Sequence, residues 1–160
     1  MNQTLILDEI DKKIVTIIQK NPTITHTKLA RKVNRSQPTI GMRIKKLEES
    51  GLLKFQAGLS VKNLDCYFAK VNIQTSDPSK LKQIIISCPH IIQGYRLSGS
   101  TNFVMIIACS ALKELDKIVN YHFRKNPEVK IVNTEIISEI ITEFVIPVDF
   151  RTESCNCLKK

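Results

Sequence analysis

Basic side chains crowd the first third of this sequence without acidic neighbours. No Asp or Glu occurs between Asp11 and Glu48, and this stretch holds ten basic residues: Lys12, Lys13, Lys20, Lys28, Arg31, Lys32, Arg35, Arg43, Lys45 and Lys46. Exposed helical faces ordinarily mix both signs, because opposite charges four residues apart attract. Ten like charges repel one another, and an arriving polyanion relieves the repulsion. The pattern predicts a phosphate-binding surface, with a generally basic soluble surface as the alternative.

The overall composition agrees with this concentration of charge. Lys and Arg outnumber Asp and Glu by 24 to 15, and residues 1–54 hold eleven basic against five acidic side chains. Hydrophobic residues make up 42% of the 160 residues, which supports a packed core and excludes wholesale disorder. The length fits one ordinary domain or two small ones. No apolar run is long enough to span a membrane, and the N-terminus lacks a secretory pattern, so we expect a cytoplasmic protein.

Residues 1–53 are expected to form three short helices. Asp8, Thr25 and Ser36 are candidate N-caps, and Pro38 falls in a first turn, where its missing N–H costs nothing. The third helix has an apolar face of Ile40, Ile44 and Leu47. Two helices joined by a tight turn, here Asn34-Arg35, are what a helix-turn-helix requires.

The outward face of the third helix suits double-stranded DNA. Gln37, Thr39 and Arg43 offer hydrogen bonds to base edges, whereas Lys45 and Lys46 offer contacts to phosphates. The full predicted contact set is Lys28, Arg35, Ser36, Gln37, Thr39, Met42, Arg43, Lys45 and Lys46. A plain three-helix bundle with a lysine-rich exterior is the alternative.

From Leu52 the hydrophobic period changes to that of strands. Residues 53–59 alternate loosely, as a wing or linker strand would, and we assign 54–64 to this connection. Residues 65–148 then read as strand, helix, strand, strand, helix, strand: 66–75, 77–88, 91–97, 102–109, 112–124 and 129–146. This βαββαβ order predicts an α+β protein whose second domain is ferredoxin-like. Residues 149–160 remain as a C-terminal tail.

The last expected strand is apolar on both faces. Ile136, Ile137, Ile140, Ile141 and Val145 lie along it. A single sheet covered by helices on one face leaves the other open, so a second copy of the chain is its natural cover. We therefore expect a homo-oligomer.

Several motifs together resemble the Lrp/AsnC (leucine-responsive, feast/famine) transcription regulators. They are LDEIDKKI at residues 7–14, LARKV at 29–33 and SQPTIGMRIKKLEESGLL at 36–53. The resemblance extends over about residues 5 to 146. It implies an N-terminal winged helix-turn-helix on operator DNA and a C-terminal domain that forms a homodimer. Assembly of dimers into a tetramer or octamer is also implied.

The same resemblance implies that an amino acid binds between dimers as an effector. The corresponding loop here is Gly99, Ser100, Thr101 and Asn102, followed by Phe103. Asn102 stands where many members carry an acid, so a ligand ammonium would lose a charged partner there. Regulation without an effector, or a simple hairpin turn, stays open.

Two other functions share this architecture. One is non-specific coating of chromosomal DNA, which would use the same basic face. The other is an enzyme resembling the siroheme decarboxylases. The three histidines, His26, His90 and His122, have no sequence neighbour at nucleophile or metal spacing, so we expect no catalytic residue and no cofactor.

The five cysteines are scattered and odd in number, which does not indicate a disulfide framework. Cys155 and Cys157 in the tail could form a redox pair or half of a metal site. Zinc needs four ligands and no second pair is apparent, so we expect a disordered tail and no metal site.

Overall fold

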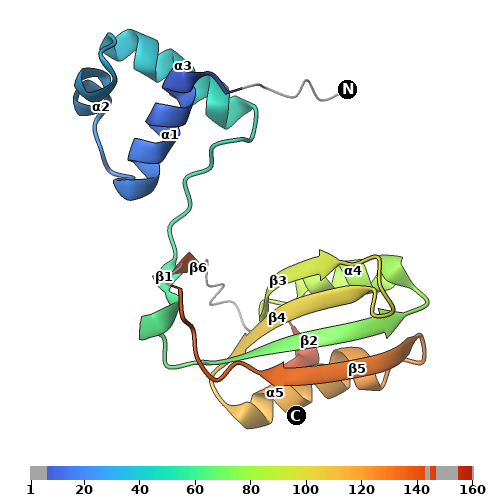
Figure 1. The fold of residues 1–160 in the computed structure, drawn as a ribbon. Helices are drawn as coiled ribbons and strands as arrows, with labels where there is room; N and C mark the ends of the chain where they lie inside the picture. Colours follow the sequence, from blue (N-terminus) through green and yellow to red (C-terminus); the bar gives the residue numbers. More distant parts are fainter. Residues whose placement is uncertain (1–6, 143–144, 147–154, 160) are drawn as a thin grey trace. The chain divides into compact units, whose positions relative to one another are not determined.

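The computed structural model describes residues 7–142, 145–146 and 155–159. The chain divides into two compact units, Met1–Gln56 and Ala57–Lys160 (Figure 1). Each unit has its own hydrophobic core. Among the described residues, no helix has the length and apolar character needed to cross a membrane.

The first unit consists of three helices: α1 (Glu9–Lys20), α2 (His26–Val33) and α3 (Gln37–Glu49). The predicted caps are confirmed. The Asp8 carboxylate accepts hydrogen bonds from the backbone N–H of Ile10 and of Asp11, and the Thr25 and Ser36 hydroxyls each accept one from the third helical residue. Each cap satisfies a backbone N–H that would otherwise lack an intrahelical partner.

The core of the first unit joins all three helices. Ile14 and Ile18 of α1 pack with Leu29 and Ala30 of α2 and with Ile40, Ile44 and Leu47 of α3. Between α2 and α3, Asn34 adopts a left-handed conformation with φ 54°, which Asn tolerates better than most residues. The turn is therefore tight, and α3 presents the side opposite its core residues to solvent.

The second unit is built around a four-stranded antiparallel sheet of order β3-β4-β2-β5. The strands are β2 (Tyr67–Thr75), β3 (Ile91–Arg96), β4 (Phe103–Cys109) and β5 (Val129–Ile136), and the helices are α4 (Pro78–Ser87) and α5 (Leu112–Val119). This order and connectivity are those of a ferredoxin-like fold, so the predicted fold class is confirmed.

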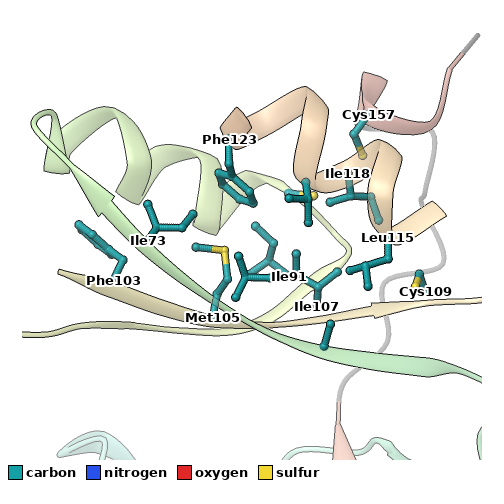
Figure 2. Close-up of a cluster of buried hydrophobic side chains, with 14 of the residues drawn as sticks. Ile73, Ile91, Phe103, Met105, Ile107, Cys109, Leu115, Ile118, Phe123 and Cys157 are labelled. Carbon is teal, nitrogen blue, oxygen red and sulfur yellow. The ribbon is translucent and has the colours of Figure 1, made fainter. Parts of the chain in front are cut away.

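Both helices cover the same face of the sheet (Figure 2). Alternate residues of the central strands point into this core, among them Ile73 of β2 and Met105 and Ile107 of β4, where they meet Ile118 and Phe123. Gly94 lets β3 approach α4 closely: a Cβ built there would lie 2.5 Å from Cγ2 of Ile85.

Two elements differ from the sequence predictions. The last strand was expected to run to residue 146, but β5 ends at Ile136, which pairs with Ala69 of β2. The N–H of Ile137 still donates to the Phe68 carbonyl, but β2 begins at Tyr67, so it offers no partner for the residues that follow towards 146. Beyond that point, strand pairing returns at β6 (Val145–Ile146), which lies antiparallel to β1 (Leu59–Ser60). Residues 53–58, expected to begin a wing or linker strand, form no strand.

The second predicted helix of this unit also changes character before it ends. After Val119 it continues as a five-residue π-helix, η2 (Asn120–Arg124), in which the backbone N–H of Lys125 donates to the carbonyl of Asn120. A short 3₁₀ helix, η1 (Val61–Asn63), follows β1, and another, η4 (Asn156–Leu158), lies near the C-terminus.

The C-terminal residues that the structure describes are packed against the second unit. Cys155 and Cys157 are 9% and 4% exposed and belong to its main core, with Leu158 packed against that core. The expectation of a disordered tail is therefore wrong for residues 155–158. Residues 149–154 of that tail lie outside the described residues.

Candidate nucleic-acid interface

The solvent-facing side of α3 carries most of the predicted DNA contacts. Gln37, Lys45 and Lys46 are exposed, and Met42 is 67% exposed although it is apolar. Ile40, Ile44 and Leu47 on the other side are at most 5% exposed. A helix with one buried and one polar, basic face can lie in a major groove while its other side stays on the domain core.

The N-terminal turn of α3 is held by side-chain hydrogen bonds. The Thr27 hydroxyl donates to Oε1 of Gln37 over 3.3 Å, which ties α3 to α2. The Ser36 and Thr39 hydroxyls lie 2.8 Å apart, and the Ser36 Oγ also accepts the Thr39 backbone N–H. Because Gln37 accepts through its oxygen, its NH₂ group remains free of hydrogen bonds to the described residues, and this group can donate to a base edge.

Arg43 occupies a different environment from the one we expected. Its Nη1 lies 2.6 Å from Oδ2 of Asp8 and 2.7 Å from Oδ1 of Asp11, so one guanidinium nitrogen joins α3 to the start of α1. The Arg43 side chain is 29% exposed, and that of Asp11 only 13%. The expectation that the charges of this stretch lack counter-charges is therefore wrong for Arg43.

These contacts also shift the ionisation of the groups involved. The backbone N–H of Asp11, followed by the Arg43 guanidinium, lowers the pKa of the Asp8 carboxyl to about 2. The two carboxylates in turn raise the pKa of Arg43. Both effects favour the charged forms, so the ion pairs persist throughout the neutral range.

The remaining basic residues differ in their pairing. Lys12 pairs with Glu9 at 2.7 Å and Lys45 with Glu49 at 3.7 Å, both on exposed surfaces. Seven others make no ion pair with the residues that the structure describes: Lys13, Lys20, Lys28, Arg31, Lys32, Arg35 and Lys46. Their charges remain available to phosphates.

Three members of the predicted contact set lie outside α3: Lys28, Arg35 and Ser36, which is the N-cap of α3. Lys28 is exposed on α2, and Arg35 is exposed in the turn that leads into α3. The Arg35 guanidinium donates to the carbonyl oxygen of Asn34 over 2.8 Å, which bends it back along its own turn. All three are within the helix-turn-helix element itself.

The predicted effector loop, Gly99, Ser100, Thr101 and Asn102, connects β3 to β4. Asn102 is held by the backbone of Thr75: its Oδ1 accepts the Thr75 N–H over 3.0 Å, and its Nδ2 donates to the Thr75 carbonyl over 2.8 Å. The side chain thus closes the loop onto the end of β2. In this arrangement both of its polar atoms are engaged.

A pocket of about 420 Å³ lies beside this loop, between α4 and β3. Lys82 and Arg96 provide positive charge at its lining, whereas Ile85, Tyr95 and Phe103 provide apolar surface. A cation pair next to an apolar wall can hold a small carboxylate that carries an apolar side chain.

The C-terminal cysteines have partners that sequence spacing did not reveal. Cys88 and His122 lie beside Cys155 and Cys157, and the ligand atoms of all four residues are within 4.8 Å of one another. The expectation that these cysteines lack a second pair of metal ligands is therefore wrong. The four residues come from three separate segments of the second unit.

Each of the two units matches a known family of domains. Residues 7–54 match a model of winged helix-turn-helix DNA-binding domains, and residues 66–145 match the Lrp/AsnC ligand-binding domain. The HTH-type transcriptional regulator LrpC of Bacillus subtilis is 26% identical over 142 residues, which cover 86% of this chain and 96% of LrpC.

Solved structures share the fold along most of the chain. AsnC of Escherichia coli superposes with a TM-score of 0.76 at 19% identity, covering 86% of this chain and 96% of AsnC. A transcriptional regulator of Neisseria meningitidis in complex with L-Met gives 0.74 at 20% identity, covering 86% and 93%. The chain belongs to the Lrp/AsnC family and is a DNA-binding transcription regulator.

Proposed function

We propose that the protein recognises specific operator sequences by inserting α3 into the major groove of double-stranded DNA. The observation that carries this proposal is the exposed face of α3, where polar and basic side chains oppose a fully buried apolar face. Gln37, Thr39 and Met42 are assigned to base edges, with Met42 contacting a thymine methyl group. Contacts that position the protein on phosphates come from Lys28, Arg35, Lys45 and Lys46, while Ser36 caps the helix.

Arg43 has a positioning role in this proposal. Its Nη1 already contacts Asp8 and Asp11, so moving that nitrogen to a guanine would leave both carboxylates without their partner. We therefore assign the reading of bases mainly to Gln37 and Thr39. The role assigned to Arg43 is to hold α3 in a fixed orientation against the start of α1.

Specific binding by this mode requires two copies of the chain. A dimer would place two recognition helices in successive major grooves, about 10 base pairs apart on a partly palindromic site. Support comes from apolar side chains that the second unit leaves in solvent: Ile131, Ile136, Ile141 and Val145 are 45%, 56%, 80% and 58% exposed. Light scattering on a size-exclusion column tests this, and a monomer at micromolar concentration would contradict it.

An amino-acid effector fits the second unit at the pocket between α4 and β3. The solved neighbour from Neisseria meningitidis is a complex with L-Met, and Lys82 and Arg96 here could hold such a carboxylate. Calorimetry with the twenty amino acids tests the idea. Binding that is lost in Arg96→Ala but kept in Lys62→Ala would support this pocket, whereas no binding by any amino acid would favour regulation without an effector.

The experiment that tests the main proposal is a titration of two DNA fragments at about 150 mM salt. One fragment is the DNA upstream of the protein's own gene, and the other is a scrambled fragment of equal length. Binding about a hundredfold tighter to the first supports a specific regulator. Equal, salt-sensitive binding to both would instead favour chromosome coating.

Gln37→Ala sharpens this test. The substitution removes the free NH₂ group from an exposed side chain, so it should narrow the difference between the two fragments without unfolding the domain. Lys62→Ala in the second unit is the matched control and should leave the difference unchanged. A difference that survives in Gln37→Ala would refute the assignment of base reading to this residue.

A further inference from the structure

Three cysteines and one histidine converge at one end of the core of the second unit. Cys88 follows the last residue of α4, His122 lies in the π-helix η2, and Cys155 and Cys157 lie at η4. Their ligand atoms are within 4.8 Å of one another, and Nε2 of His122 is 3.2 Å from Sγ of Cys155. Figure 2 shows Cys157 at the edge of the core, beside Ile118 of α5.

The convergence is built by the fold of the whole unit. Cys88, Cys155 and Cys157 are 3%, 9% and 4% exposed and belong to the same buried cluster as Leu115 and Ile118. His122 is placed by the π-helix, whose wider turn changes the direction of the side chains that follow α5. Such π-turns are rare in proteins and occur frequently at functional sites.

The donor set matches a structural zinc site. Three thiolates and one imidazole are a standard four-ligand set for Zn²⁺, with Zn–S near 2.3 Å and Zn–N near 2.0 Å. A tetrahedron with these bond lengths separates its ligand atoms by about 3.8 Å. The observed upper limit of 4.8 Å is within about 1 Å of that value, so small side-chain rotations would close the site.

The sulfurs of this cluster are shielded from water. Cys88 and Cys157 are both buried, and burial disfavours a thiolate that has no positive partner. The backbone N–H of His90 donates to the Cys88 sulfur and favours the thiolate. A bound Zn²⁺ deprotonates coordinating thiols outright, because the cation supplies the charge that the buried site lacks.

We propose that Cys88, His122, Cys155 and Cys157 bind one Zn²⁺ in a closed structural site that fastens residues 155–158 to α4 and η2. Four protein ligands leave no open coordination position, so the ion holds segments together and performs no chemistry on a substrate. A disulfide is the competing arrangement. It would join only two of the three sulfurs and would give His122 no role.

The test uses the full-length protein, purified anaerobically with reductant, stripped of metal and titrated with Co²⁺ and then Zn²⁺. We expect the visible absorption of tetrahedral, thiolate-bound Co²⁺ at one ion per chain, and its loss when one equivalent of Zn²⁺ is added. Saturating zinc should raise the Tm by about 10 °C, because it binds the folded state only.

Matched variants separate this site from adventitious binding. Cys157→Ser and His122→Asn should reduce Co²⁺ affinity at least a hundredfold, whereas Cys66→Ser and Cys109→Ser, which change free cysteines outside the cluster, should bind as the wild type does. If Cys157→Ser fails to fold, the wild-type titration and the two control variants still decide the question.

Two results would overturn the proposal. One is a wild-type chain that folds, as judged by circular dichroism, but binds less than a tenth of an equivalent of either metal. The other is a disulfide among Cys88, Cys155 and Cys157 in the anaerobically purified protein, detected by mass spectrometry after alkylation.

Discussion

Lys46→Ala is the substitution that tests most directly how α3 meets DNA. Lys46 is exposed in the second half of α3, and it makes no ion pair with any described residue. Its neighbour Lys45 pairs with Glu49 at 3.7 Å, so part of that charge is already compensated. Lys46 is therefore the residue of α3 whose whole charge is available to a phosphate.

The size of the effect follows from counterion release. Each neutralised phosphate contributes about 0.9 to the slope of log affinity against log salt concentration. If Lys46 neutralises one phosphate, its removal should reduce the slope by about 0.9 per protomer. The fall in affinity between about 50 mM and about 200 mM salt then becomes about 3.5-fold smaller for each phosphate that is no longer neutralised. Because a phosphate carries no sequence information, operator and scrambled DNA should weaken equally.

Fluorescence anisotropy at four salt concentrations, on both DNA fragments, measures these quantities. Lys113→Ala, on the exposed surface of α5, is the control for a general change of net charge and should leave the slope unchanged. Arg43→Ala should change the slope less than Lys46→Ala, because Nη1 of Arg43 is already paired with two carboxylates. An unchanged slope in Lys46→Ala, together with a smaller preference for the operator, would refute the assignment to phosphate.

Three further outcomes follow from contacts in the two units. Asp8→Asn keeps the N-cap of α1 but removes the ion pair with Arg43. Because the pKa of Asp8 falls from 3.8 to about 2 on folding, the wild type should have a higher Tm than this variant above pH 4. The difference in Tm should vanish as the pH falls towards 2. Phe123→Ala should lower the free energy of unfolding in urea by about 3 to 5 kcal/mol, since this fully buried ring fills the core beneath α4 and α5. Asn102→Asp should cost about 1 to 3 kcal/mol, because the carboxylate cannot donate to the Thr75 carbonyl, and an unchanged urea midpoint would contradict the structural role of Asn102.

Local signals were sufficient for most elements of the fold. Asp8, Thr25 and Ser36 are caps because their short oxygen-bearing side chains reach the first free N–H groups of a helix, a relation contained within four residues. The alternation of buried residues along β2 and β4 is likewise local, so their strands could be predicted. Strand β5 was overestimated because its end depends on where β2 begins, which its own sequence does not contain.

The contacts within the candidate sites were harder to predict from the sequence. The outward face of α3 followed from helical periodicity, but the pairing of Arg43 with Asp8 joins residues 35 positions apart. His122 and Cys155 are separated by 33 positions, and their contact depends on a π-turn that no hydrophobic pattern marks. Asn102 appeared as a weakened effector ligand because its partner, the backbone of Thr75, is recognised only when β2 and β4 lie side by side.

The strand order of the second unit also determines when its parts can form during synthesis. In the described part of the first unit, the core contacts join residues between Leu7 and Leu53, so that unit can fold early and locally. Strand β2 can pair with β4 next, but its other edge waits for β5, as Lys70 meets Glu135 65 residues later. At about 5 to 20 residues per second, this edge stays open for roughly 3 to 13 s. The DNA-binding helices are thus the first part of the chain that can fold. Cys155 and Cys157 are synthesised last and pack against a sheet whose four strands are already paired.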